Sequence, residues 1–326
     1  MSARLEWQGG SATLESLGGM LSPLQLSLPD GRRVEPLAVA PWVGEALPGA
    51  PPLLRSLRGS FPCLPFGTGE EGQLAQRWAG VAHDLVDPPH GAPANGLWDV
   101  WVEGGVLRGQ FAPAPDEHIA LVEQDVRPDG PAGVACRLTA TARRVCRLPI
   151  AIHPIFKLSA ITGGTKVDLH SHGPIFTHPS FSLTDPCPLM PDTIADGLDA
   201  LPARDGGTLD FLQLPRSTPS ESRVLVTHSG GRVSLHHKEG WTAHLVWDTS
   251  VLPSAMLWIS NGGRSRPPWN GRHFGLGIEP CAAAFDLGTA ASAGENPLSA
   301  AHVQTAVLLE PDQPLVVHYR ISVSAS

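Results

Sequence analysis

Short apolar runs separated by turn residues recur along the whole chain, with the period of β-strands. Residues 222–248 contain three such runs, and the glycine-containing turns SGG and KEG that join them predict a meander of consecutive strands. Residues 98–111 predict a hairpin that turns at EGG. Val317, Tyr319 and Ile321 fall on one face of a further strand.

Roughly fifteen candidate strands follow one another at the spacing that is typical of β-sandwiches. Few segments have the period of an amphipathic helix, and the Pro-rich residues 41–57 and the turn-rich residues 162–192 predict loops. No repeat of fixed period is present. We therefore predict one all-β domain over residues 1–326, in which antiparallel sheets pack face to face.

The composition is that of a globular protein and argues against two kinds of partner. Hydrophobic residues make up 42% of the chain and charged residues 17%. The net charge is −8 and the 23 Lys and Arg residues are scattered, so no binding to nucleic acid is expected. No apolar run is long enough to span a bilayer, so no membrane segment is expected.

The cysteines predict a reduced protein in the cytoplasm. Cys63, Cys136, Cys146, Cys187 and Cys281 are odd in number, irregularly spaced and contain no CxxC pair, which is typical of buried thiols rather than of a disulfide framework. The N-terminal residues MSARLEWQGG lack the apolar core of a signal peptide, which agrees with a cytoplasmic location.

Glu279 is the first candidate for chemistry, because it is an isolated acid in the apolar stretch GLGIEPCAAAFD (residues 275–286). Burial of a carboxyl group raises its pKa toward the range that is useful for proton transfer. The alternative is a glutamate at the rim of an edge strand that Pro280 ends.

Three further residues stand in contexts that suit either a site or a structural role. His153 ends a long apolar strand before Pro154, where it could be a buried core histidine or a neutral imidazole that exchanges protons near pH 7. His90 lies in a Pro- and Gly-rich loop. Arg58 lies in the apolar loop LRGSFPCLPFGTG, where it could clamp a ligand or bind loop carbonyls.

His170 and His172 raise the possibility of a metal site. With Gly164 they match the opening of a cupin motif, and two alternating histidines on a strand would share one face. The glutamate that would complete the motif is missing, since Phe176 and its neighbours occupy those places. A solvated strand face is the favoured interpretation, and no metal is expected.

Four separated stretches together resemble the aldose 1-epimerase (galactose mutarotase-like) superfamily, and are nearest to its hexose-6-phosphate epimerase-like branch. LRGSFPCLPFG resembles the RGG-P-x-x-x-P-FG loop, and PHGAPANGLWDV resembles the HGFAR-x-x-x-W-x-V segment. IAIHPIFKL resembles the HPYF-x-L strand, and GLGIEPCAAAFD resembles the G-x-x-x-EP-x-x-x-P-D strand. The four occur in the order and with the rough separations of the family, and the resemblance as a whole covers about residues 5–325.

The resemblance implies a β-supersandwich fold and an aldose 1-epimerase that interconverts α and β anomers by acid–base ring opening without a cofactor. Carried over by position, Glu279 would be the general base and His153 the general acid. His90 would be a second histidine in the site and Arg58 a sugar-binding arginine. Asp210 is our choice for the aspartate that holds a sugar hydroxyl.

The departures from the family pattern leave the substrate open. HPIF replaces HPYF, which removes a tyrosine near the expected acid, and HGAPAN replaces HGFARN, which removes an aromatic residue and an arginine. Arg264, Arg266 and Arg272 could supply phosphate contacts instead. The substrate is therefore expected to be a free aldose or a hexose phosphate. A carbohydrate-binding protein of the same fold with little or no turnover is the alternative.

Overall fold

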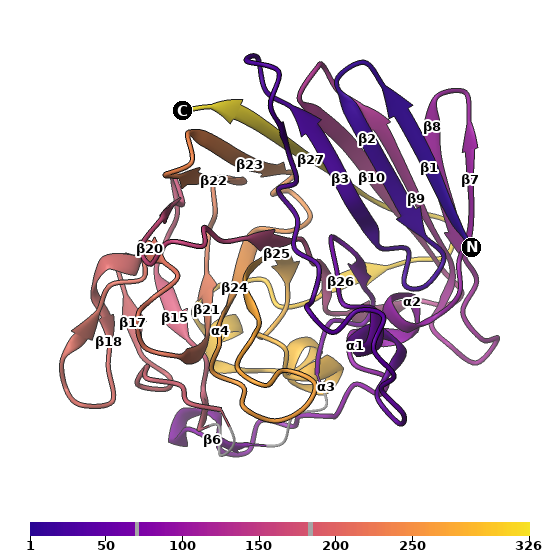
Figure 1. Ribbon diagram of the computed structural model, residues 1–326. Coiled ribbons are helices and arrows are strands. Elements are labelled where there is room, and N and C mark those ends of the chain that lie inside the picture. The colour runs from indigo at the N-terminus through magenta and orange to yellow at the C-terminus, as the bar shows by residue number, and fades with distance from the viewer. Residues whose placement is uncertain (69–71, 182–184) are drawn as a thin grey trace.

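The computed structural model of the chain describes residues 1–68, 72–181 and 185–326, and these residues form antiparallel β-sheets with a few short helices (Figure 1). The largest sheet contains nine strands in the described parts of the chain. Their order is β20 (Gln213–Leu214), β14 (Thr165–Asp168), β22 (Arg232–His237), β23 (Trp241–Trp247), β27 (Leu315–Ala325), β10 (Gly133–Ala142), β9 (Ile119–Pro128), β8 (Val106–Phe111) and β7 (Asp99–Glu103).

The second large sheet carries the candidate catalytic residues. Its strands are β17 (Ile194–Ala195), β15 (Ile175–Thr177), β21 (Ser220–Val226), β24 (Ser254–Asn261), β25 (Phe274–Ala282), β12 (Ile150–Ile152) and β5 (Pro62–Cys63), with β13 (Ile155–Lys157) also paired to β25.

Smaller elements complete the architecture. A third sheet, at the upper right of Figure 1, lies beside β7–β10 and consists of β1 (Ser2–Trp7), β2 (Gly10–Glu15), β3 (Leu21–Ser27) and β4 (Arg33–Val34). Three two-stranded ladders join β6 (Gln73–Leu74) to β16 (Ser180–Phe181), β11 (Cys146–Leu148) to β26 (Val307–Leu309), and β18 (Leu201–Pro202) to β19 (Thr208–Leu209).

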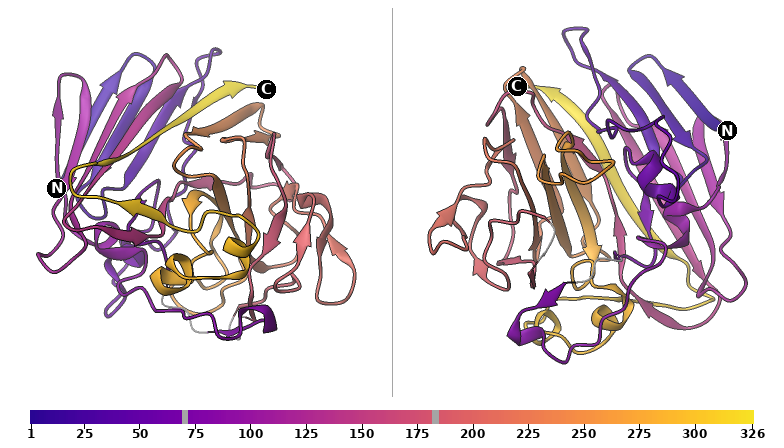
Figure 2. Two further views of the ribbon diagram at one scale, coloured as in Figure 1. Left: turned by 180° about the vertical axis from the view of Figure 1, so that it is seen from behind. Right: turned by 60° about the horizontal axis from the view of Figure 1, so that its bottom comes forward.

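The helices are short and gather in the lower half of Figure 1, away from the C-terminus, an arrangement that Figure 2 shows from two further sides. They are α1 (Pro52–Ser56), α2 (Gly91–Asn95), α3 (Gly288–Ala293) and α4 (Pro297–Ala300), with 3-10 turns at Gln76–Trp78 and Leu198–Ala200. In the ranges that the structure describes, no helix has the length and apolar character needed to cross a membrane.

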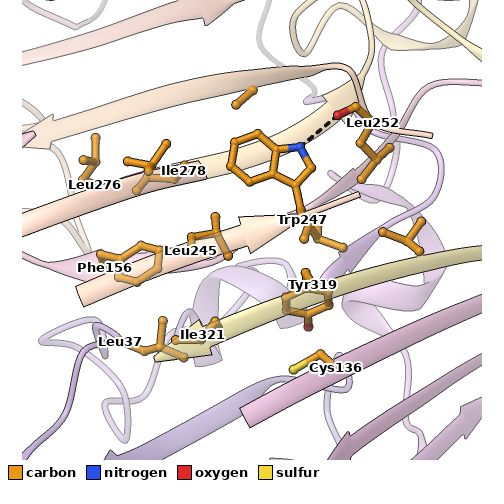
Figure 3. Close-up of a cluster of buried hydrophobic side chains, with 14 of the residues drawn as sticks. Leu37, Cys136, Phe156, Leu245, Trp247, Leu252, Leu276, Ile278, Tyr319 and Ile321 are labelled. Atoms are coloured by element: carbon orange, nitrogen blue, oxygen red, sulfur yellow. Dashed lines mark hydrogen bonds between the residues drawn. The ribbon is translucent and has the colours of Figure 1, made fainter. Parts of the chain in front are cut away.

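The two large sheets pack face to face through alternate residues of their strands. Leu276 and Ile278 of β25 belong to the same buried cluster as Leu245 of β23 and Ile321 of β27, and Figure 3 shows Leu245 and Phe156 between the β25 side chains and Ile321. Each of these side chains is at most 1% exposed. Trp247 packs in the same layer, and its indole N–H donates a hydrogen bond to the Leu252 carbonyl over 2.9 Å. The all-β prediction with face-to-face antiparallel sheets is confirmed.

Three expectations from the sequence are wrong in detail. The meander holds only for β22 and β23, since β21 pairs with β24 in the other sheet. The supposed loops contain regular structure, since residues 41–57 include α1 and residues 162–192 include β14, β15 and β16. β25 is not an edge strand that Pro280 ends, because it continues to Ala282 and has paired neighbours on both sides.

All five cysteines have free thiols. Cys63, Cys136 and Cys281 are buried, whereas Cys146 and Cys187 are half-buried, so only part of the expected burial is found.

Candidate active site

One face of three adjacent strands forms the floor of the candidate site and contributes Arg223, Met256, Trp258 and Glu279. Side chains alternate between the two faces of a strand, so residues at every second position project together. The ladders place Arg223 of β21 opposite Trp258 of β24, and Trp258 opposite Gly277 of β25. Met256 and Glu279 are paired one step further along. The intervening residues Val224, Leu257 and Ile278 belong to the core, so Arg223, Trp258 and Glu279 lie on the face away from the nine-stranded sheet.

An interruption in the neighbouring strand brings His153 to Glu279. β12 ends at Ile152 and β13 begins at Ile155, and the His153 N–H instead donates to the Phe61 carbonyl. Ile278 donates its N–H to the Pro154 carbonyl, so the alternation along β25 turns the nitrogen of Pro280 toward the same interruption. Proline is therefore tolerated in a central strand here, because its missing N–H has no regular partner strand to bond.

Glu279 and His153 form a buried acid–imidazole pair. His153 Nε2 lies 3.2 Å from Glu279 Oε1, and the two side chains are 5% and 0% exposed. No well-aligned hydrogen bond reaches either carboxyl oxygen of Glu279 from the described residues, nor His153 Nδ1. A buried carboxyl group without such partners is rare in folded proteins and is a feature of functional sites.

Burial sets the protonation of this pair. It raises the pKa of Glu279 well above its usual value of 4.5, and the charge of Asp286 raises this pKa further while Arg223 opposes the shift. Burial lowers the pKa of His153 well below its usual value, to which the nearby His90 also contributes. Both shifts favour the uncharged forms, a protonated Glu279 and a neutral His153.

His90 and two phenylalanines enclose the imidazole. The His153 ring stacks on Phe61 with centroids 4.6 Å apart and meets the His90 ring edge-on at 5.2 Å. His90 stacks in turn on Phe66. The His90 backbone is left-handed, with φ of 62°, where the loop turns into α2. Burial lowers the pKa of His90 to about 4, so this imidazole is neutral at physiological pH.

Asp286 is a second buried acid at the site, and it remains ionised. It accepts hydrogen bonds from Arg223 Nη1 and from His178 Nε2, the latter at 2.8 Å. His178 Nδ1 accepts the N–H of Ser180, which leaves the ring proton on Nε2. Burial alone would raise the pKa of Asp286, but Arg223 and His178 outweigh it and hold this pKa well below its usual value. Two acids on one surface thus have opposite protonation states.

Trp258 and Trp269 form an aromatic wall of the site beside the acid–imidazole pair, and the charged side chains that contact this wall are themselves paired. The Arg264 guanidinium lies 4.5 Å from the ring centroid of Trp269 and 5.5 Å from that of Trp258, a cation–π arrangement. Arg264 Nε donates to Asp185 over 2.9 Å. Buried Glu221 accepts the Trp258 indole N–H at 3.1 Å, which fixes the orientation of that ring.

These groups line one cavity of about 360 Å³. Glu279, His153, His90, Asp286 and the aromatic wall all contribute to its lining. The volume falls in the range of small-molecule sites, which combine apolar walls with a few converging polar groups. A proton donor and acceptor pair inside such a cavity is suited to acid–base catalysis on a small ligand.

The structure brings together three of the five residues that the sequence singled out. Glu279, His153 and His90 line the cavity. Arg58 is not among the lining residues, and its guanidinium contacts Glu15 at 3.5 Å and the Ser56 carbonyl at 3.1 Å. Asp210 is exposed and accepts the N–H of Leu212, so it also lies outside the lining.

The histidine pair considered for a metal is arranged differently from the expectation. β14 ends at Asp168, so His170 and His172 do not alternate on a strand. His170 Nε2 lies 2.9 Å from the Ser234 hydroxyl, and His172 Nδ1 lies 2.7 Å from the Gly173 carbonyl. Across the described residues, no group of three or more His, Cys, Asp or Glu side chains could hold a metal ion.

The sequence analysis did not identify the ion pairs around the acid–imidazole pair of Glu279 and His153. Asp286 closes the same stretch that contains Glu279, which was an available signal. Arg223 directly precedes the apolar residues Val224–Val226 of β21, but it follows Ser-Glu-Ser, so its context gave only a weak signal. Their partnership joins residues 63 positions apart, and no local pattern could reveal it.

Comparison with solved structures gives matches along essentially the whole chain. A protein of Escherichia coli classed provisionally as an aldose 1-epimerase matches with a TM-score of 0.68 at 15% identity, covering 100% of this chain and 99% of that one. A GalM/aldose epimerase homologue from Caenorhabditis elegans matches with a TM-score of 0.64 at 15% identity, covering 100% and 99%. The chain has the galactose mutarotase-like fold.

A protein from Lactobacillus acidophilus that is described as a galactose mutarotase related enzyme also matches, with a TM-score of 0.61 at 12% identity. The match covers 99% of this chain and 97% of that one. No protein-family model and no curated protein matches the sequence. The resemblance read from four stretches of sequence is thus confirmed at the level of the fold, and it is not resolved to a branch.

Proposed function

We propose that this protein is an aldose 1-epimerase, which interconverts the α and β anomers of a sugar by opening and reclosing its ring. The observation that carries the proposal is the buried pair of Glu279 and His153, 3.2 Å apart in the cavity wall. A protein that only binds a sugar has no need of an adjacent acid and base, whereas anomer exchange requires one group to accept a proton and another to donate one.

The reaction requires the charged form of the pair, which burial disfavours and which the hydroxyl groups of a bound sugar would stabilise by hydrogen bonding. Transfer of the Glu279 proton to His153 across 3.2 Å generates a carboxylate and an imidazolium. The carboxylate then accepts the proton of the sugar O1 while the imidazolium donates to the ring oxygen O5, and the C1–O5 bond opens. Rotation about C1–C2 followed by the reverse transfers closes the ring as the other anomer. Both protons are returned, so the cycle balances.

The surrounding groups support the same assignment. In a buried cavity of low dielectric constant, a hydroxyl group that hydrogen-bonds to a charged side chain stabilises it strongly. A bound sugar therefore favours proton transfer between the two side chains. Trp258 lines the cavity and its ring lies 5.9 Å from that of His153, so a pyranose that reaches the acid–imidazole pair would also meet this indole. The ligand implied by this site is a small sugar, in agreement with the sugar-related names of the structural relatives.

Exchange NMR of anomeric protons tests the proposal. Wild-type protein should accelerate the α/β exchange of at least one aldose in a panel of neutral and phosphorylated sugars. Glu279→Gln removes the proton acceptor and should slow the exchange by about 100-fold or more, the usual contribution of one acid–base group. Glu117→Gln makes the same change at an exposed position and is the matched control.

Retained exchange in Glu279→Gln would refute the catalytic role of the carboxylate. Wild-type protein that binds sugars without accelerating exchange would instead support the alternative, a carbohydrate-binding protein of the same fold.

A further inference from the structure

The walls of the cavity are more apolar than recognition of a fully hydroxylated sugar requires. Among the described residues that line it, ten of eighteen have no charged or polar functional group other than an indole N–H. Two clusters dominate, one on and just after α1 and one on β24 and the loop that follows it: Leu53, Leu54, Leu57, Met256, Trp258 and Trp269.

Most polar side chains that line the cavity outside the acid–imidazole pair are already engaged. Arg223 donates to Asp286, and the Thr68 hydroxyl donates to the same carboxylate over 3.3 Å. Arg264 and Arg266 both donate to Asp185. A sugar hydroxyl that enters a cavity without a partner loses its hydrogen bonds to water, which costs free energy.

The same ion pairs disfavour a phosphate group. A phosphoryl dianion would have to compete with Asp185 or Asp286 for guanidinium groups that these carboxylates already bind. Both carboxylates stay ionised, since the neighbouring arginines outweigh burial and lower the pKa of each. The two carboxylates thus neutralise two of the three positive charges of Arg223, Arg264 and Arg266, which weakens the attraction of this cluster for a phosphate.

We propose that the preferred substrate is a neutral aldose in which an apolar group replaces a hydroxyl, as in a 6-deoxyhexose. This inference rests on the proposed epimerase function of the same cavity. The methyl group of such a sugar contacts the leucine and tryptophan walls, and the missing hydroxyl removes one polar group that would need a partner. The anomeric centre meets Glu279 and His153 as in any aldose.

Matched pairs of sugars test the inference by exchange NMR. The pairs are D-fucose with D-galactose, L-rhamnose with L-mannose, and 6-deoxy-D-glucose with D-glucose, with the 6-phosphates of glucose and galactose added. After subtraction of the spontaneous rate, kcat/KM for the deoxy sugar should exceed that of its parent by about tenfold or more in at least one pair. Parents that react as well in every pair, or a phosphate that reacts fastest, would overturn the inference.

A wall variant separates this preference from catalysis. Leu54 is half-buried and lines the cavity, so Leu54→Asn should lower the deoxy-to-parent ratio by about fourfold, the value of one buried methylene. Leu308→Asn, at an exposed position on β26, should leave the ratio unchanged. An unchanged ratio in a folded Leu54→Asn protein would count against the proposed contact.

The failure of the two proposals can be told apart. If no sugar in the panel exchanges faster than it does spontaneously, the epimerase function is refuted. Tryptophan fluorescence titrations of wild-type protein with the same pairs then decide the substrate inference alone. Tighter binding of a deoxy sugar than of its parent would uphold it, and equal or weaker binding in all pairs would overturn it.

Discussion

Glu279 and Asp286 are carboxyl groups on the same cavity, and their partners alone separate their chemistry. Asp286 has a guanidinium and an imidazole N–H to stabilise its charge, whereas Glu279 faces only the imidazole of His153. Burial is complete or nearly so for both. The ionised aspartate also acts on its neighbour, because its charge raises the pKa of Glu279. The Asp286 ion pairs therefore help to keep a proton on the acid–imidazole pair.

The raised pKa of Glu279 predicts a pH dependence of folding stability. Below its usual pKa of 4.5, both the folded and the unfolded chain hold the proton. Above that pH the unfolded chain releases it and the folded chain keeps it. The free energy of unfolding therefore falls, by at most about 1.4 kcal/mol per pH unit, until the folded pKa is reached.

Glu279→Gln lacks this titration, so its stability relative to wild type should rise as the pH increases above about 4.5. Urea denaturation of both proteins from pH 4 to pH 8 measures the difference, with Glu117→Gln as the surface control. A difference that is constant or falls over this range would show that the folded pKa of Glu279 is not raised.

At the scale of elements, the sequence predicts where the strands lie better than it predicts which strands pair with each other. Alternation is a local property, so the hairpin of β7 and β8 and the ladder of β22 and β23 could be read directly. The same pattern on β21 gives no sign that this strand leaves the meander for the other sheet. Pairing between distant strands depends on how the chain crosses between layers, which no window of sequence contains.

The candidate site shows the same limit. Glu279 and His153 could be identified from motifs because each has a distinctive local context. Arg58 was expected in a loop and Asp210 on a strand, yet their side chains bind local partners instead of lining the cavity. Which of several plausible side chains reach a cavity is decided by the register of strands and by loop packing.

Gly277 of β25 is required by the close approach of three side chains. A Cβ at this position would lie 2.6 Å from Glu279 Oε1, 3.2 Å from Trp258 Cβ and 3.3 Å from His153 Cε1. Gly277→Ala should therefore displace the carboxyl group and slow anomer exchange by about tenfold or more, since a misplacement of an ångström or less already lowers rates strongly.

Gly275→Ala is the matched control on the same face of β25. Its Cβ would meet His273 and Ile155 at 3.2 Å and is not near the carboxyl group. Exchange NMR with both variants, together with thermal melts to verify folding, makes the comparison. Equal activity of the two folded variants would contradict the steric role assigned to Gly277.

At the scale of the whole molecule, β27 joins the two halves of the nine-stranded sheet. It lies between β23 and β10, so four strands flank it on each side in the described sheet. Val317, Tyr319, Ile321 and Val323 of β27 are at most 5% exposed. β1, by contrast, forms the border of the four-stranded sheet and has no fully buried residue.

This difference predicts how the chain responds to losing each strand. Burial of four large apolar side chains contributes about 6–12 kcal/mol, which is comparable to the entire stability of a typical domain. A chain that ends before Leu315 should therefore fail to fold, whereas one that lacks residues 1–8 should fold with a lower melting temperature. Circular dichroism and thermal melts of both proteins distinguish these outcomes. A cooperative transition in the chain without β27 would mean that the halves of the sheet fold separately, against our proposal that residues 1–326 form one domain.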